Sequence, residues 1–340
     1  MQVMVTGGAG YLGSVITDQL LEAGHAVVVL DNLSKGHRDA VAKGARFIEG
    51  DLLESDFVRD ILEREEVDAV VHMAASSLVG ESMRVPERYY RNNVIATLAL
   101  LEAMRAVGVQ MMVFSSTAAV YGEPAKQPIV ESDATAPSNP YGETKLVCER
   151  ALHWHHRAHD LFYVSLRYFN AAGATRARGE RHDPETHLIP LVLSALDPGN
   201  PPVTVFGIDY PTRDGTCVRD YVHVSDLARA HVAALEALEN GALRQGIFNL
   251  GSGTGHTVWE VLEAARRVTG RNIPTHIGLK RPGDPPVLVA SADRIREALG
   301  WVAQRGTLEE IVESAWKWKI AHDTNWSAFR QSSASRPTTR

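Results

Sequence analysis

The sequence contains little that would staple a protein covalently or anchor it to a charged or lipid partner. Only two of its 340 residues are cysteines, Cys148 and Cys217, without a Cys-x-x-Cys pair, which excludes a disulfide scaffold. No run of 18 apolar residues occurs, which excludes an ordinary transmembrane helix. Lys and Arg number 35 against 41 Asp and Glu, a net charge of −6, so no overall attraction to nucleic acid or an anionic membrane is expected.

The length and the first residues are typical of a water-soluble protein. At about 150 residues per domain, 340 residues predict two structural units with ample core. Met1–Gly7 is expected to be a strand that runs into a glycine turn, because it lacks the cationic and long apolar regions of a signal peptide. We therefore expect a reduced, cytoplasmic protein.

The first half of the chain alternates short apolar runs with amphipathic stretches. Helices are predicted at Tyr11–Ala23, Asp56–Arg64 and Glu87–Ala106, the last with Tyr90, Val94, Leu98 and Leu101 on one face. The alternation predicts an α/β fold with a doubly wound, parallel Rossmann-type sheet covered on both faces. Its strands are expected at Val3–Thr6, Ala26–Leu30, Ala45–Ile48, Ala69–Met73, Met111–Ser115 and Tyr163–Arg167.

After about residue 168 the pattern becomes that of a smaller, mixed α/β lobe. Gly173–Glu185 and Asp197–Pro202 are rich in Gly, Pro and charge, which predicts loops. Strands (Val203–Phe206, Val218–His223, Ile247–Leu250, Val287–Ala290) and helices (Ser225–Leu238, Val258–Val268, Leu308–His322) complete the lobe. We expect a division into residues 1–170, residues 171–322 and a disordered tail over 323–340.

The segment Gly7–Gly13 matches G-x-x-G-x-x-G between the first strand and the first helix. Such glycines let a diphosphate approach the backbone N–H groups at a helix N-terminus. Asp31 ends the second strand and is expected to accept hydrogen bonds from ribose hydroxyls, which favours NAD over NADP. Lys35 and Arg38 follow nearby, and holding a 2′-phosphate is their alternative role. Asp51, after the third strand, is expected either beside adenine or at a helix N-cap.

A hydroxyl, a tyrosine and a lysine indicate proton-coupled hydride chemistry at an alcohol carbon. Thr117 ends the fifth strand, and Pro140 suits the start of a helix that carries Tyr141 and Lys145. At i and i+4 these two side chains share one helix face. A nearby ammonium and a cationic nicotinamide would lower the pKa of the phenol, so that Tyr141 can act as a base. Thr117 would orient the substrate hydroxyl.

Eight further segments carry a family resemblance: Val5–Tyr11, Leu30–Leu33, Val79–Ser82, Asn92–Val94, Arg167–Asn170, Phe206–Thr212, Val218–Val224 and Arg281–Asp284. Over about residues 1–322 the chain resembles the extended short-chain dehydrogenase/reductase family and, within it, the UDP-glucose 4-epimerases. The stretch from Asp209 to His223 is typical of these epimerases. The resemblance implies that UDP-glucose and UDP-galactose are interconverted by a homodimer: hydride leaves sugar C4 for NAD and returns through a 4-keto intermediate. Residues 1–170 would bind NAD, and 171–322 mainly the UDP-sugar.

The resemblance also implies which residues form the site. The cofactor contacts would be Gly7, Gly10, Tyr11, Leu12, Gly13, Asp31, Asn32, Asp51, Leu52, Met73, Ala74, Asn92, Lys145, Tyr168 and Phe169. The substrate contacts would be Thr117, Tyr141, Asn170, His187, Leu188, Phe206, Arg219, Arg281, Asp284 and Leu288. Each arginine can fork onto diphosphate oxygens, although a surface salt bridge is its alternative role.

Several positions depart from the common family pattern. Thr117 replaces the usual serine and keeps the hydroxyl, whereas Ser77 stands where many members carry a cofactor-contacting lysine. His187 stands where asparagine is frequent, and it can still donate to a substrate. Leu288 occupies the position that controls sugar size, and its intermediate bulk predicts weaker use of UDP-N-acetylglucosamine.

Two other functions are less compatible with the residues. A nucleotide-sugar dehydratase or decarboxylase of the same fold would carry an acid directly after Thr117, but Ala118 and Ala119 stand there and cannot move protons. A non-enzymatic NAD-binding regulator would be free to lose the tyrosine and the lysine, which this chain keeps. No metal site is expected, because the cluster of His153, His155, His156 and His159 has no carboxylate or cysteine to complete it.

Overall fold

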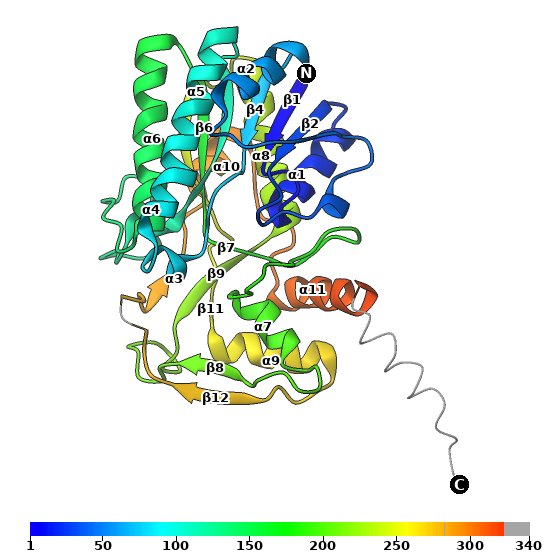
Figure 1. Ribbon diagram of the computed structural model, residues 1–340. Helices are drawn as coiled ribbons and strands as arrows, with labels where there is room; N and C mark the ends of the chain where they lie inside the picture. The colour runs from blue at the N-terminus through cyan, green and yellow to red at the C-terminus, as the bar shows by residue number, and fades with distance from the viewer. Residues whose placement is uncertain (282, 323–340) are drawn as a thin grey trace, which may run out of the picture.

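The computed structural model describes residues 1–281 and 283–322. Pro282 and the tail expected over residues 323–340 lie outside the described residues. Figure 1 shows a sheet with helices on both sides, which includes the N-terminus, above a smaller lobe of short strands and helices. None of the described helices combines the length and the hydropathy needed to cross a bilayer.

Seven parallel strands form the main sheet in the order β10-β6-β5-β4-β1-β2-β3. The strands are β1 (Gln2–Thr6), β2 (Ala26–Asp31), β3 (Arg46–Glu49), β4 (Ala69–His72), β5 (Met111–Thr117), β6 (Phe162–Tyr168) and β10 (Gln245–Leu250). The order reverses between β1 and β4, which opens a crevice at the carboxyl ends of these strands. The predicted doubly wound α/β sheet is confirmed.

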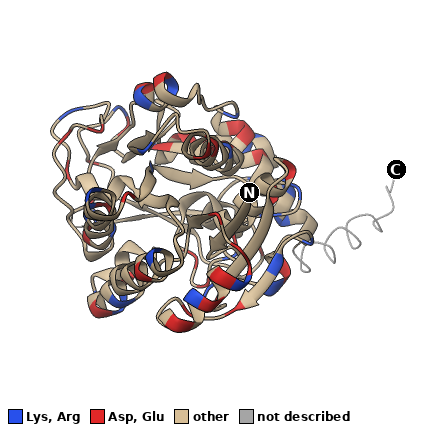
Figure 2. Cartoon of the chain, turned by 90° about the horizontal axis from the view of Figure 1, so that it is seen from above, with Lys and Arg blue, Asp and Glu red and all other residues tan. Residues whose placement is uncertain are grey.

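Helices cover both faces of the sheet, and each face has its own apolar core. The first core contains buried residues of α1 (Tyr11–Glu22), α8 (Val224–Glu239) and α10 (Asp293–Leu299). The second contains residues of α2 (Ser55–Arg64), α5 (Ala96–Val107) and α6 (Pro140–His159). Burial of each Val or Leu side chain stabilises the fold by roughly 1.5–3 kcal/mol. The main sheet and its two cores, which we call the platform, therefore support the strand ends rigidly. In Figure 2 acidic and basic residues are interspersed over the outer helices.

The helix predicted over Glu87–Ala106 buries only part of the face that was expected. A π-helical turn over Tyr90–Ile95 joins the short α4 (Pro86–Tyr89) to α5. Tyr90 and Leu98, expected in the core, are 43% and 38% exposed, whereas Tyr89 is fully buried. Leu101 is buried and Val94 packs against the second core, as expected. The prediction was wrong for Tyr90 and Leu98, because a wider turn changes the phase of the helix, and the apolar spacing does not reveal that change.

The smaller lobe is arranged around β9 (Val218–His223), which pairs with β7 (Asn170–Ala172), β11 (Gly255–Thr257) and β13 (Val287–Leu288). Separately, β8 (Val203–Phe206) pairs with β12 (Thr275–Gly278). Helices α7 (Leu188–Ser194), α9 (Val258–Thr269) and α11 (Leu308–His322) supply most of its core. The three-residue strands β7 and β11, and β12, were not among those predicted.

The chain returns to the main sheet after entering the smaller lobe. Helix α8 packs beside α1 in the first core, and β10 pairs with β6 from Gln245↔Tyr163 to Leu250↔Tyr168. The main sheet therefore does not follow the division expected at residue 170. The change in composition near residue 168 marks where long loops begin, not where the sheet ends.

Candidate active site

The glycine turn between β1 and α1 brings backbone close to the crevice. Gly7 has a φ of +70°, and a β-carbon there would lie 2.6 Å from the backbone nitrogen of Ala74. A β-carbon on Gly13 would lie 2.2 Å from the Gly7 carbonyl oxygen. Gly10 is the N-cap of α1, whose first-turn N–H groups have no partner inside the helix. A diphosphate needs this close approach and these donors, so the turn fits a dinucleotide.

Three polar side chains meet where β2 and β3 end. The Asp31 side chain accepts two backbone N–H groups at 3.0 and 2.8 Å, and burial raises the pKa of this carboxyl. The Asn32 amide donates to the Asp51 carboxylate at 2.9 Å. The N-cap of α2 is Glu54, so the N-cap alternative for Asp51 is wrong. The three side chains lie together where the adenosine end of a dinucleotide was expected.

The other expected cofactor residues come from four segments. They are Tyr11 and Leu12 in the first turn of α1, Leu52 after β3, Met73 and Ala74 after β4, and Asn92 in the π turn. The Tyr11 hydroxyl donates to the carbonyl of Gly173 in the smaller lobe. The Asn92 amide donates to the Ser76 hydroxyl at 3.1 Å. The first contact joins the smaller lobe to α1, and the second joins the π turn to the segment that follows β4.

Helix α6 begins in a way that sets the position of the tyrosine. The Asn139 side chain caps the helix by accepting the Gly142 N–H at 2.9 Å, and Pro140 occupies the first turn. Both features fix where the helix starts. Tyr141 and Lys145 therefore lie one turn apart near that start, as their spacing predicted.

Thr117 and Lys145 both lie near Tyr141 at the carboxyl end of β5. Thr117 is the last residue of β5, and its side chain lies close enough to Tyr141 to lower the pKa of the phenol, against the larger effect of burial. The Lys145 ammonium donates to the Ser115 carbonyl at 2.8 Å and lies 4.8 Å above the Phe114 ring. The structure thus brings the three expected catalytic side chains to the end of one strand.

The pKa values of this group are governed by burial. Burial raises the pKa of Tyr141, and the hydrogen bond with Thr117 opposes that rise. Burial lowers the pKa of Lys145 to about 8, against the opposing effect of Cys148 and Glu149. Burial thus dominates the pKa of Tyr141 while the Lys145 ammonium is directed at the Ser115 carbonyl; the expected lowering was that of the ammonium together with a cationic nicotinamide.

Tyr168 and Phe169 continue the strand beside Thr117. Tyr168 pairs with Thr117 in the β5–β6 register, and its hydroxyl is hydrogen-bonded to His231. Burial raises the pKa of Tyr168 well above its ordinary value. Phe169 packs against a small apolar cluster that includes Leu146 of α6. Both aromatic residues lie at the strand ends where the nicotinamide was expected.

The expected diphosphate and uridine residues gather in the smaller lobe. The Arg281 guanidinium lies 3.9 Å from the centroid of the Phe206 ring. Arg219 forms an ion pair with Asp284, and these side chains are 14% and 28% exposed. The Asn170 amide donates to the backbone carbonyl that follows Arg219, at 3.1 Å. Arg219 is thus held inside the site rather than in an exposed surface salt bridge.

Leu288 links the lobe to the strand ends. It pairs with Arg219 in the β9–β13 register. Its side chain packs against the same apolar cluster as Phe169. A larger or smaller side chain at position 288 would therefore change the space between Arg219 and Phe169.

His187 is the N-cap residue of α7, and Leu188 is the first helical residue. Although burial acts against it, Glu185 and Glu180 raise the pKa of His187. Ligand atoms of Glu180, His182 and His187 lie within 4.8 Å of one another, a grouping that sequence reasoning missed. Nδ1 of His187 is 2.8 Å from a Glu185 oxygen, and Nδ1 of His182 is 2.5 Å from a Glu180 oxygen. The cluster is therefore an internally paired ionic group.

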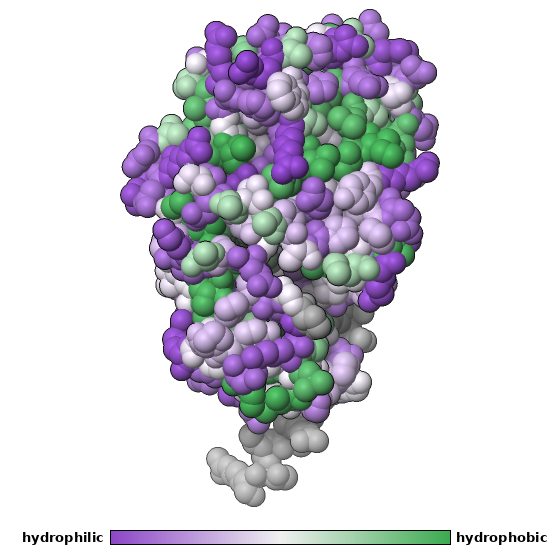
Figure 3. All heavy atoms as spheres, turned by 90° about the vertical axis from the view of Figure 1, so that its left-hand side faces the viewer, coloured by the Kyte–Doolittle hydropathy of each residue, from purple (hydrophilic) through white to green (hydrophobic). Residues whose placement is uncertain are grey.

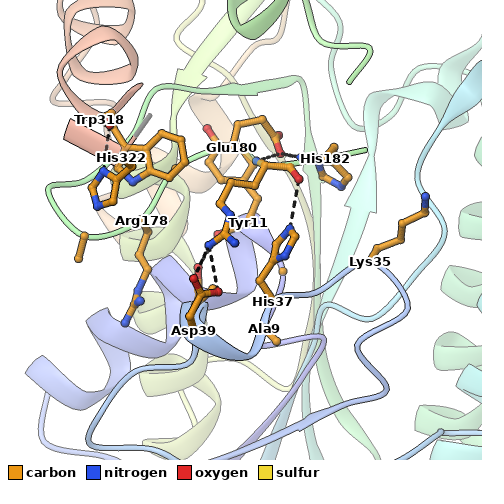
Figure 4. Close-up of a pocket in the computed structure, with 16 residues that line it drawn as sticks. Ala9, Tyr11, Lys35, His37, Asp39, Arg178, Glu180, His182, Trp318 and His322 are labelled. Carbon is orange, nitrogen blue, oxygen red and sulfur yellow. Dashed lines mark hydrogen bonds and ion pairs between the residues drawn. The ribbon is translucent and has the colours of Figure 1, made fainter. Parts of the chain in front are cut away.

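A loop of the smaller lobe, residues 173–187, covers the glycine turn; we call it the covering loop (Figure 4). Arg178 forks onto Asp18 of α1 at 2.8 and 3.1 Å. Arg181 pairs with Asp39 at 2.9 Å, and Lys35 donates to a loop carbonyl at 2.7 Å. A cavity of about 130 Å³ remains between the loop, the turn and α11. These contacts close one side of the crevice.

Asn93 is a second residue that sequence reasoning missed. It is 1% exposed, and its amide oxygen accepts the Ser76 N–H at 2.8 Å. Its amide nitrogen donates to the Thr144 hydroxyl at 3.0 Å, so it ties the π turn to α6 beside Tyr141. The pair Asn92-Asn93 was a signal, but only the phase of the helix tells which of the two faces inward.

The sequence pattern of the NAD dependent epimerase/dehydratase family matches residues 3–251 of this chain. The chain belongs to this family. It is 52% identical over 320 residues to a UDP-glucose 4-epimerase of Streptomyces lividans, covering 94% of this chain and 96% of that protein.

Solved structures of the family resemble the fold closely. The UDP-glucose 4-epimerase of Brucella ovis in complex with NAD is 45% identical, with a TM-score of 0.90 over 93% of this chain and 97% of that one. The enzyme from Bifidobacterium longum in complex with NAD+ and UDP is 34% identical, with a TM-score of 0.89 over 96% of this chain and 100% of that one. The family member described here is an enzyme, and its cofactor is NAD.

We predict that nucleotide released from the purified protein by denaturation is NAD or NADH and not NADP, because the Asp31 carboxylate would repel a 2′-phosphate. Lys35 and Arg38 do not offset this repulsion, since they contact the covering loop and Glu49. Asp31→Asn should improve NADP binding relative to NAD by about tenfold, since charges about 4 Å apart repel by roughly 1–4 kcal/mol. Titration of nucleotide-free protein measures the ratio, with the exposed Asp56→Asn as control. An unchanged ratio would contradict this role of Asp31.

Proposed function

We propose that the enzyme interconverts UDP-glucose and UDP-galactose at C4 of the sugar. The observation that carries the proposal is that Tyr141, near the start of α6, lies close to Thr117, the last residue of β5, with Lys145 one turn further along the same helix. On one side of this pair lies the glycine turn, and on the other lie the arginines of the smaller lobe. The resemblance to named UDP-glucose 4-epimerases over nearly the whole chain supports the same substrate.

The side chains divide the proposed reaction between them. Thr117 orients the 4-hydroxyl of the sugar, and Tyr141 removes its proton and later returns it. Lys145 keeps a positive charge at the end of β5 while the proton moves. NAD, which the glycine turn and Asp31 would hold, would supply a reversible hydride acceptor for C4, so that no net oxidation would occur.

The competing functions remain less well supported. The four residues after Thr117 form a 3₁₀ turn, Ala118–Tyr121, which begins with two alanines. A dehydratase needs a further acid and base to remove a C5 proton and protonate a leaving hydroxyl, and neither alanine can serve. A regulator without catalysis would not need Thr117, Tyr141 and Lys145 together at one strand end.

Tyr141→Phe should leave NAD bound and lower kcat by roughly 10²–10⁴-fold, the usual contribution of a general base. The assay incubates UDP-galactose with the enzyme and measures UDP-glucose. Tyr163→Phe is a matched control, because Tyr163 is equally part of the buried structure but lies at the opposite end of β6 from Tyr168. Near-normal turnover by Tyr141→Phe would refute the assignment of the base.

The same site supports a limited use of N-acetylated sugars. Leu288 is smaller than tyrosine and larger than serine or cysteine, and it lies between Arg219 and the cluster that holds Phe169. An apolar wall of this kind discriminates one small group by about 10–200-fold. We therefore propose that UDP-N-acetylglucosamine is a slower substrate than UDP-glucose.

Leu288→Tyr should lower kcat/KM for UDP-N-acetylglucosamine about 10–200-fold more than for UDP-glucose, because the larger ring fills the space beside C2. Leu279→Tyr, at a side chain that is 91% exposed, provides the control for an added ring elsewhere in the lobe. If both substrates keep their original ratio in Leu288→Tyr, Leu288 does not limit the size of the sugar.

We also propose that two copies of the chain form a homodimer through the outer face of α5. Ile95 and Leu98 are 54% and 38% exposed on successive turns, and Tyr90 is exposed just before them. Figure 3, which looks onto the side of α5 and α6, shows apolar residues gathered in its upper half. Exposed apolar side chains on adjacent turns suit an interface between copies.

Sedimentation equilibrium should give a mass twice that of the 340-residue chain. Leu98→Glu should shift the mass toward that of one chain, because a buried carboxylate at the interface costs several kcal/mol. Leu279→Glu should leave the mass unchanged. A wild-type mass of one chain, or a Leu98→Glu dimer as stable as the wild type, would exclude this interface.

A cytoplasmic location is a final part of the proposal. Cys148 and Cys217 are both free and buried. Free thiols of this kind are typical of a reducing compartment.

A further inference from the structure

A buried ion pair lies behind the catalytic residues. The Arg167 guanidinium of β6 forks onto the Glu149 carboxylate of α6, at 2.9 Å from Nε and 2.6 Å from Nη2. The two side chains are 4% and 3% exposed. The pair therefore lies in an almost water-free environment, where its geometry is tightly determined.

The pair is the centre of a network that joins five elements, among them the 3₁₀ turn that contains Tyr121. The Ser116 hydroxyl of β5 donates to the Glu149 carboxylate at 2.5 Å. Arg167 donates to the Tyr121 hydroxyl at 2.7 Å, and Tyr121 donates to the Asn249 side chain of β10 at 2.7 Å. Helix α6 is thus fastened to strands β5, β6 and β10 at one level of the sheet.

Three members of the network, Glu149, Ser116 and Arg167, adjoin residues of the proposed site. Glu149 lies one helical turn after Lys145, on the same side of α6. Ser116 lies between Ser115, whose carbonyl accepts the Lys145 ammonium, and Thr117. Ser116 and Arg167 are partners in the β5–β6 register, and the next pair in that register is Thr117 and Tyr168.

A contribution to the stability of the fold does not by itself explain why such a buried ion pair is present. The free-energy cost of removing two charges from water offsets much of the gain from their mutual attraction. Apolar residues of similar volume often stabilise a fold as well or better. Two charges with a forked geometry do fix the distance between their elements more narrowly than apolar contacts do. The proposed reaction requires a fixed position of α6 relative to β5.

We propose that Glu149 and Arg167 are positioning residues that hold Tyr141 and Lys145 of α6 against Thr117 of β5. This inference rests on the proposed function of these three residues. Loss of the pair lets α6 shift against the strand end while the crevice still binds the substrate. A displacement of about 1 Å in a reacting group costs about 10²-fold in rate.

The first variant is Glu149→Gln, which keeps the shape of the side chain and removes its charge. We expect kcat to fall roughly tenfold to a hundredfold, with KM for UDP-galactose and the amount of bound NAD close to wild type. Arg167→Lys keeps the charge but cannot make the fork, so it should lower kcat similarly while disturbing the fold less.

Glu149→Gln leaves a buried charge without its partner and can therefore fail to fold. The double variant Glu149→Gln, Arg167→Met removes both charges and keeps the volume. We expect it to fold, with a Tm near that of the wild type, and still to show the lowered kcat. Asp226→Asn is the matched control: Asp226 is 1% exposed and accepts two backbone N–H groups at 3.1 and 3.0 Å, so this change should lower Tm without lowering kcat per folded enzyme.

The outcomes separate the positioning role from a structural one. Wild-type kcat in the folded double variant would overturn the proposal, as would a raised KM with unchanged kcat. An active Tyr141→Phe enzyme would instead refute the proposed function of the site itself. An inactive Tyr141→Phe enzyme together with a fully active double variant would refute only the positioning role.

Discussion

Gly7 lies so close to the backbone of Ala74 that a β-carbon on it would stand 2.6 Å from the Ala74 nitrogen. This contact brings the ends of β1 and β4 together at the point where the strand order reverses. The start of α1 is fixed by it, because Gly10 and Gly13 complete the same tight turn. The adenosine end at β2 and β3, and the catalytic end at β5 and β6, then lie on opposite sides of one crevice.

The proposed reaction also requires contact between the two lobes. The chain makes this contact by passing back and forth between them. After the smaller lobe begins, α8 and β10 return to the main sheet before the chain leaves it again. Leu288 then packs with Phe169 in one apolar cluster. The substrate residues are therefore attached to the platform at several points, which suits a site that must bind a sugar at its strand ends.

The fold and the principal residues could be predicted because they depend on local patterns. Apolar runs gave the strands, glycines marked the first turn, and the i, i+4 spacing placed Tyr141 above Lys145. The inward face of the helix at Tyr89 was missed, because a π turn alters the phase without altering the composition. The burial that raises the pKa of Tyr141 could not be predicted either, since it depends on the elements packed around the start of α6. The partners Glu149 and Arg167 come from a helix and a strand, and no spacing rule connects them.

The covering loop has a consequence for how the protein responds to its medium. Its ties to the first third of the chain include the Arg178–Asp18 pair, which is mostly shielded, and the Arg181–Asp39 pair, whose side chains are 39% and 70% exposed. An exposed pair contributes only about 0–1 kcal/mol and is screened when salt shortens the Debye length to a few ångströms. The apolar cores on either side of the sheet are not weakened in this way. Rising ionic strength therefore loosens the outer edge of the covering loop first, while the platform beneath it keeps its shape.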